Sequence, residues 1–250
     1  MIFYFSGTGN SYQAALALRG PGEALFDLAA CLRERRTSFA PGAGEAVGFV
    51  CPVYYGGLPS VVLDFIHALR LETGPEYCYG LLTCGGSPAG AAGMLQGALR
   101  GRGVELDAAY AVTMPENYVV FFRCPEEAVR DAILEEAEVS LTGIAAAVRR
   151  RERRGLPVDL GAWLMTQAMY PLYGRMRSTR RFYTDEQCIG CGTCVRRCPA
   201  GAMVMEEGRP KWVEEKCIHC MSCIRCGAVH YGRGTRGKKR YTNPVLKSCH

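Results

Sequence analysis

The first eleven residues, MIFYFSGTGNS at positions 1–11, decide how the N-terminal half of the chain is interpreted. A short apolar run, Ile2–Phe5, is followed at once by small and hydroxyl-bearing residues, and a helical stretch then runs from about Tyr12 to Arg19. No basic segment precedes the apolar run, so it predicts a buried strand and not a signal peptide. A strand, a tight polar turn and a helix in this order open an α/β fold.

The same alternation continues to about residue 155. Further apolar runs predict strands at Val47–Val50, Tyr77–Thr83 and Leu106–Thr113. Helices are predicted at Val61–Leu69, at about Ala89–Arg100 and, longest of all, from Glu126 to about Arg154, with Gly155 at its end. Strands that alternate with helices predict a parallel sheet with helices on both faces.

The composition fits a folded protein of one or two domains without a membrane span. Of 250 residues, 48% are hydrophobic and 22% are charged, which is enough apolar material for a sizeable core. No apolar run reaches the roughly 18 to 20 residues that a spanning helix needs, so we expect a cytoplasmic protein. Fourteen cysteines are present, and eight of them lie between Cys188 and Cys226. Cysteines concentrated in this way usually bind metal rather than form disulfides.

The first cysteine group has the spacing of bacterial ferredoxins. It reads Cys188-x2-Cys191-x2-Cys194-x3-Cys198, with Pro199 directly after it. Three thiolates two residues apart can wrap around one iron–sulfur cubane, while the fourth ligates the other cluster. A zinc site normally uses two separated pairs, so this spacing disfavours zinc.

A second group repeats the first. It reads Cys217-x2-Cys220-x2-Cys223-x2-Cys226, and it lacks one residue before its last cysteine and the proline after it. Two [4Fe–4S] clusters are therefore expected. Under the crosswise rule one takes Cys188, Cys191, Cys194 and Cys226, and the other takes Cys198, Cys217, Cys220 and Cys223. The shortened loop leaves the role of Cys226 open. His219, inside the second group, is expected to pack or face solvent, because four cysteines already suffice.

The loop of residues 6–11 predicts a phosphate site. Its members Ser6, Gly7, Thr8, Gly9, Asn10 and Ser11 combine small residues, three hydroxyls and the amides of a helix start. The loop lacks the Gly-Lys-Ser/Thr of nucleotide hydrolases and the G-x-G-x-x-G of dinucleotide folds. An ordinary strand–helix turn remains the alternative.

Two more loops follow predicted strands, at the edge where open α/β sheets bind ligands. One holds Pro52, Val53, Tyr54, Tyr55, Gly56 and Gly57, and the other holds Thr83, Cys84, Gly85 and Gly86. Tyrosine rings offer a stacking surface for a flat ligand, and glycines allow backbone groups to approach it. Together the three loops resemble the FMN site of flavodoxins.

The chain as a whole resembles the EFR1-type flavodoxin–ferredoxin fusion proteins. The resemblance is carried by residues 6–11, Thr83–Pro88, Met114–Tyr118 and the double cysteine motif. It implies a flavodoxin-like, doubly wound parallel five-stranded sheet plus a small α+β two-cluster ferredoxin-like domain. It also implies FMN, two [4Fe–4S] clusters, and contacts from Asn117 and Tyr118 to the flavin.

Three segments are predicted: a flavodoxin-like domain at residues 1–155, an apolar and basic connector at 156–183, and a ferredoxin-like domain with a basic tail at 184–250. The apolar part of the connector contains Trp163, Met165, Met169 and Tyr173. It is expected to pack in the core between the domains, with peripheral docking on a membrane or partner as the alternative.

The predicted function is electron transfer between FMN and the clusters, which joins two-electron to one-electron chemistry. The alternatives are a flavin-dependent reductase of a small molecule or quinone, and a redox-sensing or structural iron–sulfur protein. A reductase needs a proton donor beside the flavin, for which Cys84, Glu116 and Tyr118 are candidates. The net charge is +6. The arginines of residues 149–154 suit a helix C-terminus better than a nucleic-acid surface. The basic residues near the C-terminus either attract an acidic redox partner or form a solvated tail; they are Arg225, Arg233, Arg236, Lys238, Lys239 and Arg240.

Overall fold

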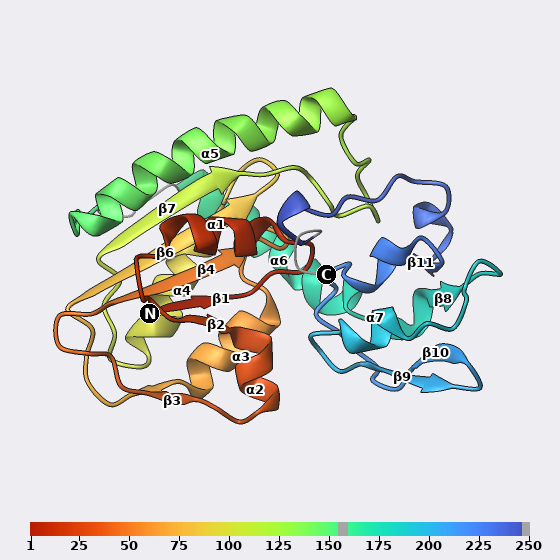
Figure 1. Ribbon diagram of the computed structural model, residues 1–250, viewed down its shortest axis with the longest axis horizontal. Coiled ribbons are helices and arrows are strands. Elements are labelled where there is room, and N and C mark those ends of the chain that lie inside the picture. Colours follow the sequence, from red (N-terminus) through yellow and green to blue (C-terminus); the bar gives the residue numbers. More distant parts are fainter. Residues whose placement is uncertain (155–159, 247–250) are drawn as a thin grey trace.

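The computed structural model describes residues 1–154 and 160–246, and its centre is a five-stranded parallel sheet (Figure 1). The sheet strands are β1 (Ile2–Tyr4), β2 (Leu25–Asp27), β4 (Ala46–Pro52), β6 (Tyr77–Cys84) and β7 (Ala108–Thr113). Their order is β2-β1-β4-β6-β7, and all neighbours are parallel. Numbered along the chain, this is the 2-1-3-4-5 order of flavodoxin-like folds, so the predicted fold class is confirmed.

Helices cover both faces of the sheet. Helices α1 (Asn10–Leu18) and α5 (Glu127–Arg149) pack on one face. The other face carries α2 (Leu28–Arg33), α3 (Ser60–Ala68) and α4 (Ala91–Arg100). All eight residues of β6 are buried, with alternate side chains in the two cores. Burial on both faces explains why the central strands appear in the sequence as continuous apolar runs.

Two short strands, β3 (Ser38–Phe39) and β5 (Arg70–Leu71), pair outside this sheet. The edge strand β2 and helix α2 had not been predicted. Both are too short for their periodicity to stand out. Gly155, predicted at the end of the long helix, lies outside the described residues.

The cysteine-rich region forms a small α+β unit with its own core (Figure 1). Strand β8 (Phe182–Thr184) pairs with β11 (Val229–Tyr231), and β9 (Met203–Glu206) pairs with β10 (Arg209–Trp212), both antiparallel. The helical segments are α7 (Thr193–Arg196), η2 (Cys223–Cys226) and η3 (Arg233–Thr235). The segment that precedes β8 is η1 (Thr179–Arg181).

The two units exchange core residues. Ile218 of the cysteine-rich region belongs to the core beneath α3 and α4, and Val119, which follows β7, belongs to the core of the small unit. The C-terminal turn η4 (Pro244–Leu246) lies beside the start of α1 (Figure 1). Just before it, the Tyr241 hydroxyl donates to Asn10 Oδ1 over 2.9 Å. The domain limits at residues 155 and 184 stay predictions.

The apolar connector is helix α6 (Leu160–Met176), and only part of it is buried. Tyr173 is buried, as expected. Trp163, Met165 and Met169 are exposed, so the prediction of core packing is wrong for these three side chains. Within the described ranges, no helix has the length and apolar character required to cross a membrane.

Candidate cofactor sites

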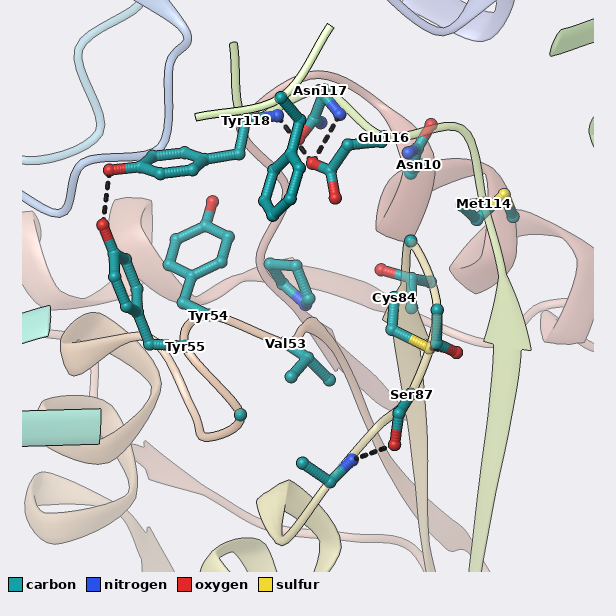
Figure 2. Close-up of a pocket in the computed structure, with 18 of the residues that line it drawn as sticks. Asn10, Val53, Tyr54, Tyr55, Cys84, Ser87, Met114, Glu116, Asn117 and Tyr118 are labelled. Carbon is teal, nitrogen blue, oxygen red and sulfur yellow. Dashed lines mark hydrogen bonds between the residues drawn. The ribbon is translucent and has the colours of Figure 1, made fainter. Parts of the chain in front are cut away.

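A cavity of about 390 Å³ lies at the carboxyl ends of β1, β4 and β6 (Figure 2). Ligand pockets usually measure about 300–1,000 Å³, and open α/β sheets bind ligands at this edge. All of the residues predicted from the three loops line it, together with Asn117 and Tyr118, except Gly9 and Gly57. A side chain at Gly9 would meet Asn243, and one at Gly57 would meet Met94 and Tyr170, so both glycines face neighbouring segments instead.

Residues 6–11 form the polar end of the cavity. Gly9 is the N-cap of α1 in a left-handed conformation (φ +106°), and its amide donates to Ser6 Oγ over 3.1 Å. Ser11 Oγ lies 2.7 Å from Thr83 Oγ1, which joins the first loop to the end of β6. The N-terminal amides of a nine-residue helix attract an anion, and the hydroxyls add neutral donors. The arrangement fits one phosphate group.

Tyrosines line the opposite side of the cavity (Figure 2). A tight turn, in which the amides and carbonyls of Tyr54 and Gly57 bond each other at 2.9 and 3.0 Å, presents Tyr55. The hydroxyls of Tyr55 and Tyr118 lie 2.7 Å apart. These rings supply the flat surface expected beside a planar ligand.

The three candidate proton donors are held in different ways. Glu116 Oε1 accepts hydrogen bonds from the amides of Asn117 and Tyr118 at 2.9 and 2.7 Å, so its role in the structure is to shape this loop. The Cys84 thiol donates to the carbonyl of Gly86, and burial raises its pKa. Burial, with the Tyr55 hydroxyl adding to it, also raises the pKa of Tyr118. Cys84 and Tyr118 are therefore protonated at neutral pH.

The mouth of the cavity is apolar. Five of its lining side chains are large, hydrophobic and still exposed; they are Phe121, Phe122, Met165, Met169 and Leu172. No Lys or Arg occurs among the described residues that line the cavity. The mouth therefore suits an uncharged molecule better than a second anion.

Four cysteines from both motifs line a second, small cavity; they are Cys198, Cys217, Cys220 and Cys223. Burial, with the nearby charge of Cys198 adding to it, raises the pKa of Cys217 to about 11. This grouping is the one that the crosswise rule predicts. The amide of His219 donates to Cys217 Sγ over 3.2 Å, and the amide of Ala202 donates to Cys198 Sγ over 3.4 Å. Amides that already point at sulfur fit an iron–sulfur cluster, whose potential depends on such hydrogen bonds.

The other four cysteines differ in exposure: Cys194 is buried and Cys188 is half-buried. Burial raises the pKa of Cys194, and the charges of Cys226 and Cys188 raise it further. The assignment of Cys226 to this group stays a prediction. Cys191 and Cys226 are exposed. In the described part of the chain, no three His, Cys, Asp or Glu side chains converge closely enough to hold a single metal ion.

The two motifs share one backbone conformation. Gly190 and Gly192 in the first have φ +69° and +70°, and the corresponding His219 and Met221 in the second have φ +62° and +60°. Glycine adopts this left-handed region without strain, whereas side chains disfavour it. Alignment of the two motifs places His219 opposite Gly190, and this is the signal in the sequence that could have indicated a left-handed backbone at the histidine.

The cavity and the four-cysteine site share a wall. His219 lines both, and its Nδ1 lies 2.8 Å from the Tyr118 hydroxyl. Burial, followed by the charges of Arg177 and Arg181, lowers the pKa of His219 to about 4, so its ring is neutral at pH 7. Gly7 of the phosphate loop packs so closely that an added Cβ would lie 2.3 Å from the Cys220 carbonyl oxygen.

Comparison with known families bears on the cysteine-rich region. Residues 181–226 match the 4Fe-4S dicluster domain. A comparison with curated proteins gave no match. The fusion type as a whole therefore stays a resemblance, whereas the iron–sulfur character of the C-terminal region is supported by the match.

Three solved structures have a similar chain path over part of this chain. The Trp repressor binding protein from Bacillus subtilis is 15% identical, with 62% of this chain and 100% of that chain covered and a TM-score of 0.39. Rubredoxin oxygen:oxidoreductase from the anaerobe Desulfovibrio gigas is 22% identical, with 60% and 36% covered and a TM-score of 0.34. An FMN-dependent NADH-azoreductase from Bacillus anthracis is 13% identical, with 56% and 73% covered and a TM-score of 0.28.

Proposed function

We propose that this chain carries electrons between an FMN in the large cavity and two [4Fe–4S] clusters. Residues 6–11 would hold the phosphate, and the loops at 52–57, 83–86 and 117–118 would hold the ring. One cluster, here called the inner cluster, would take Cys198, Cys217, Cys220 and Cys223. The outer cluster would take Cys188, Cys191, Cys194 and Cys226. When bound, FMN exchanges one or two electrons and each cluster exchanges one.

The observation that carries the proposal is the wall shared by the two cavities. His219 lines both of them, and Gly7 touches the Cys220 carbonyl. A flavin in the large cavity and the inner cluster would therefore be separated by a wall that is one residue thick. The exposed Cys191 and Cys226 suggest that the outer cluster exchanges electrons with an external protein.

An acidic redox partner is part of the proposal. Arg233 and Arg236 are exposed on the small unit and can attract acidic side chains. Lys238 differs, because its ammonium group donates to the carbonyls of Val119 and Phe122 at 2.8 and 3.2 Å. The alternative of a wholly solvated basic tail is therefore wrong for this lysine, which instead ties the two units together.

Anaerobic purification followed by quantitation of iron, sulfide and flavin tests the proposal. We expect about eight irons and about one FMN per chain, given two four-iron clusters. Stepwise reduction should then move electrons between the flavin and the clusters within single molecules. The absorption bands of the flavin and of the clusters report this transfer. An iron-free protein, or one that takes up no FMN, would contradict the proposal.

The apolar mouth supports a second candidate function, the reduction of a neutral, apolar small molecule at the flavin. The reduced protein should then transfer electrons faster to 1,4-naphthoquinone than to its sulfonated, anionic derivative. Met169→Lys, at the mouth, should lower the rate at which the neutral acceptor is reduced. Leu160→Lys, exposed on the same helix but away from the cavity, should leave that rate unchanged. Equal rates for both acceptors and all three proteins would exclude this function and leave the electron carrier.

A further inference from the structure

His219 keeps a side chain at a backbone position where its counterpart in the first motif is glycine. Gly190 and His219 each follow the first cysteine of their motif by two residues and precede the second. Both have a left-handed backbone, at φ +69° and +62°. Because a side chain raises the energy of this conformation, glycine would be the less strained choice at position 219. The imidazole is thus maintained against backbone strain.

The His219 ring is buried and has one nitrogen bonded. It is 2% exposed, and Nδ1 lies 2.8 Å from the Tyr118 hydroxyl, which in turn lies 2.7 Å from the Tyr55 hydroxyl. A consistent chain has Tyr55 donating to Tyr118 and Tyr118 donating to Nδ1. Nδ1 is then an acceptor, and the proton of the neutral ring is on Nε2.

Nε2 has no hydrogen-bond partner in the described part of the chain, although it is fully buried. A buried donor without an acceptor is costly, so an acceptor is expected there. The two ring nitrogens point to different sides, and Tyr118 occupies the Nδ1 side. His219 also lines the small cavity beside Cys217 and Cys220, which would hold the inner cluster.

Aromatic rings offer Nε2 only a weak alternative. The Tyr231 ring centroid lies 4.5 Å from that of His219 at an angle of 74°, so an N–H could point at its face. Contacts of this kind are weaker than a hydrogen bond to a charged acceptor. The sulfurs of a bound, negatively charged cluster provide such an acceptor.

We infer that His219 is a positioning residue shared by the two cofactor sites, with Nδ1 fixing Tyr118 in the flavin cavity and Nε2–H donating to a sulfur of the inner cluster. The inference rests on the proposed function, because it needs that cluster to be bound. A hydrogen bond to a cluster sulfur favours the reduced, more negative state and raises the reduction potential. The potential of the inner cluster is thus coupled to the tyrosines of the flavin cavity through one imidazole.

Two glycine variants separate the side chain from the backbone. His219→Gly removes the imidazole and relieves the left-handed strain, and Met221→Gly relieves the corresponding strain two residues later. Each purified protein is first assayed for iron and FMN, and the midpoint potentials of both clusters are then measured by anaerobic titration followed by electron paramagnetic resonance. We expect His219→Gly to lower the potential of one cluster and leave the other unchanged. Met221→Gly should change neither.

A measurement on the unaltered protein keeps the test independent of how the variants fold. In protein that carries 15N in the histidine rings alone, the reduced inner cluster should show a weak coupling to one ring nitrogen and to the exchangeable proton on that nitrogen. Absence of both couplings, or unchanged potentials in an iron-replete His219→Gly protein, would overturn the inference and leave Nε2 on the Tyr231 ring. Absence of iron from the unaltered protein would instead contradict the proposed function.

Discussion

Gly7 lies where the phosphate loop meets the second cysteine motif, and a single methyl group there tests the proposed junction. A Cβ at position 7 would lie 2.3 Å from the Cys220 carbonyl oxygen and 3.0 Å from the Cys220 Cβ. Non-bonded carbon atoms pack at about 3.5–4.0 Å, so Gly7→Ala must separate the two loops by about 1 Å. The obstacle is backbone on both sides, which no rotamer change can relieve.

Overpacking of this kind usually lowers the free energy of unfolding by about 1–3 kcal/mol. For a chain of this size, that cost lowers the melting temperature by roughly 2–12 °C. The shift moves the phosphate loop, so FMN affinity should fall as well. Each 1.4 kcal/mol lost from the free energy of FMN binding lowers the affinity about tenfold. Thermal melting and fluorescence titration with FMN measure the two effects.

Gly86→Ala is the matched control. Gly86 also lines the cavity, but no atom lies within 4 Å of an added Cβ. Its melting temperature should stay close to that of the unaltered protein, so it controls for the stability effect; its FMN affinity is not used, because Gly86 belongs to a loop that would hold the ring. If Gly7→Ala behaves like Gly86→Ala, the phosphate loop and the cysteine motif are not packed together, and the reasoning that brings the two cofactors to one wall fails.

Four further predictions follow from the same contacts. Cys226→Ala should lower the iron content by one cluster or leave a three-iron centre. Cys51→Ala, in the buried sheet core, should leave the iron content unchanged. A colorimetric iron assay and electron paramagnetic resonance spectra distinguish the outcomes. Asn243→Ala removes side-chain hydrogen bonds of 2.6 and 3.2 Å to the start of α1. It should lower the free energy of unfolding by about 1–3 kcal/mol and weaken FMN binding, whereas Thr242→Ala should do neither. Equal melting curves for the two variants would contradict this. Tyr118→Phe should destabilise the protein by about 1–3 kcal/mol, because a buried imidazole nitrogen loses its partner. An anaerobic chelator should remove iron in two phases, the exposed outer cluster first and with FMN retained; a single phase with simultaneous flavin release would refute the assignment of inner and outer sites.

The sheet and its loops could be predicted because their signals are local. Central strands such as Tyr77–Cys84 are buried on both faces and appear as unbroken apolar runs, and the ligand loops follow them directly. Leu25–Asp27 escaped detection because three half-buried residues at a sheet edge carry no pattern of their own. The cysteine spacing likewise identified the iron–sulfur region, although it could not decide the position of Cys226.

The rest of the site depends on contacts between residues far apart in the chain. Asn243 is fully buried against the start of α1, and Ile218 enters the core of the first unit. Neither residue carries a local signal, because each acquires its role only when the small unit packs on the sheet. The role of His219 is hidden for a similar reason, because its partner, Tyr118, is 101 positions away.

The same packing makes the two cysteine sites unequal. The inner site is closed by the phosphate loop at Gly7, by the core residue Ile218 and by the buried ring of His219. The outer site has Cys191 and Cys226 at the surface. Burial away from water disfavours the more highly charged reduced state of a cluster, and hydrogen bonds to its sulfurs favour that state. If the clusters bind as proposed, the inner site needs donors such as the amide and the imidazole of His219, whereas the outer site, closer to water, can use glycine at the corresponding position.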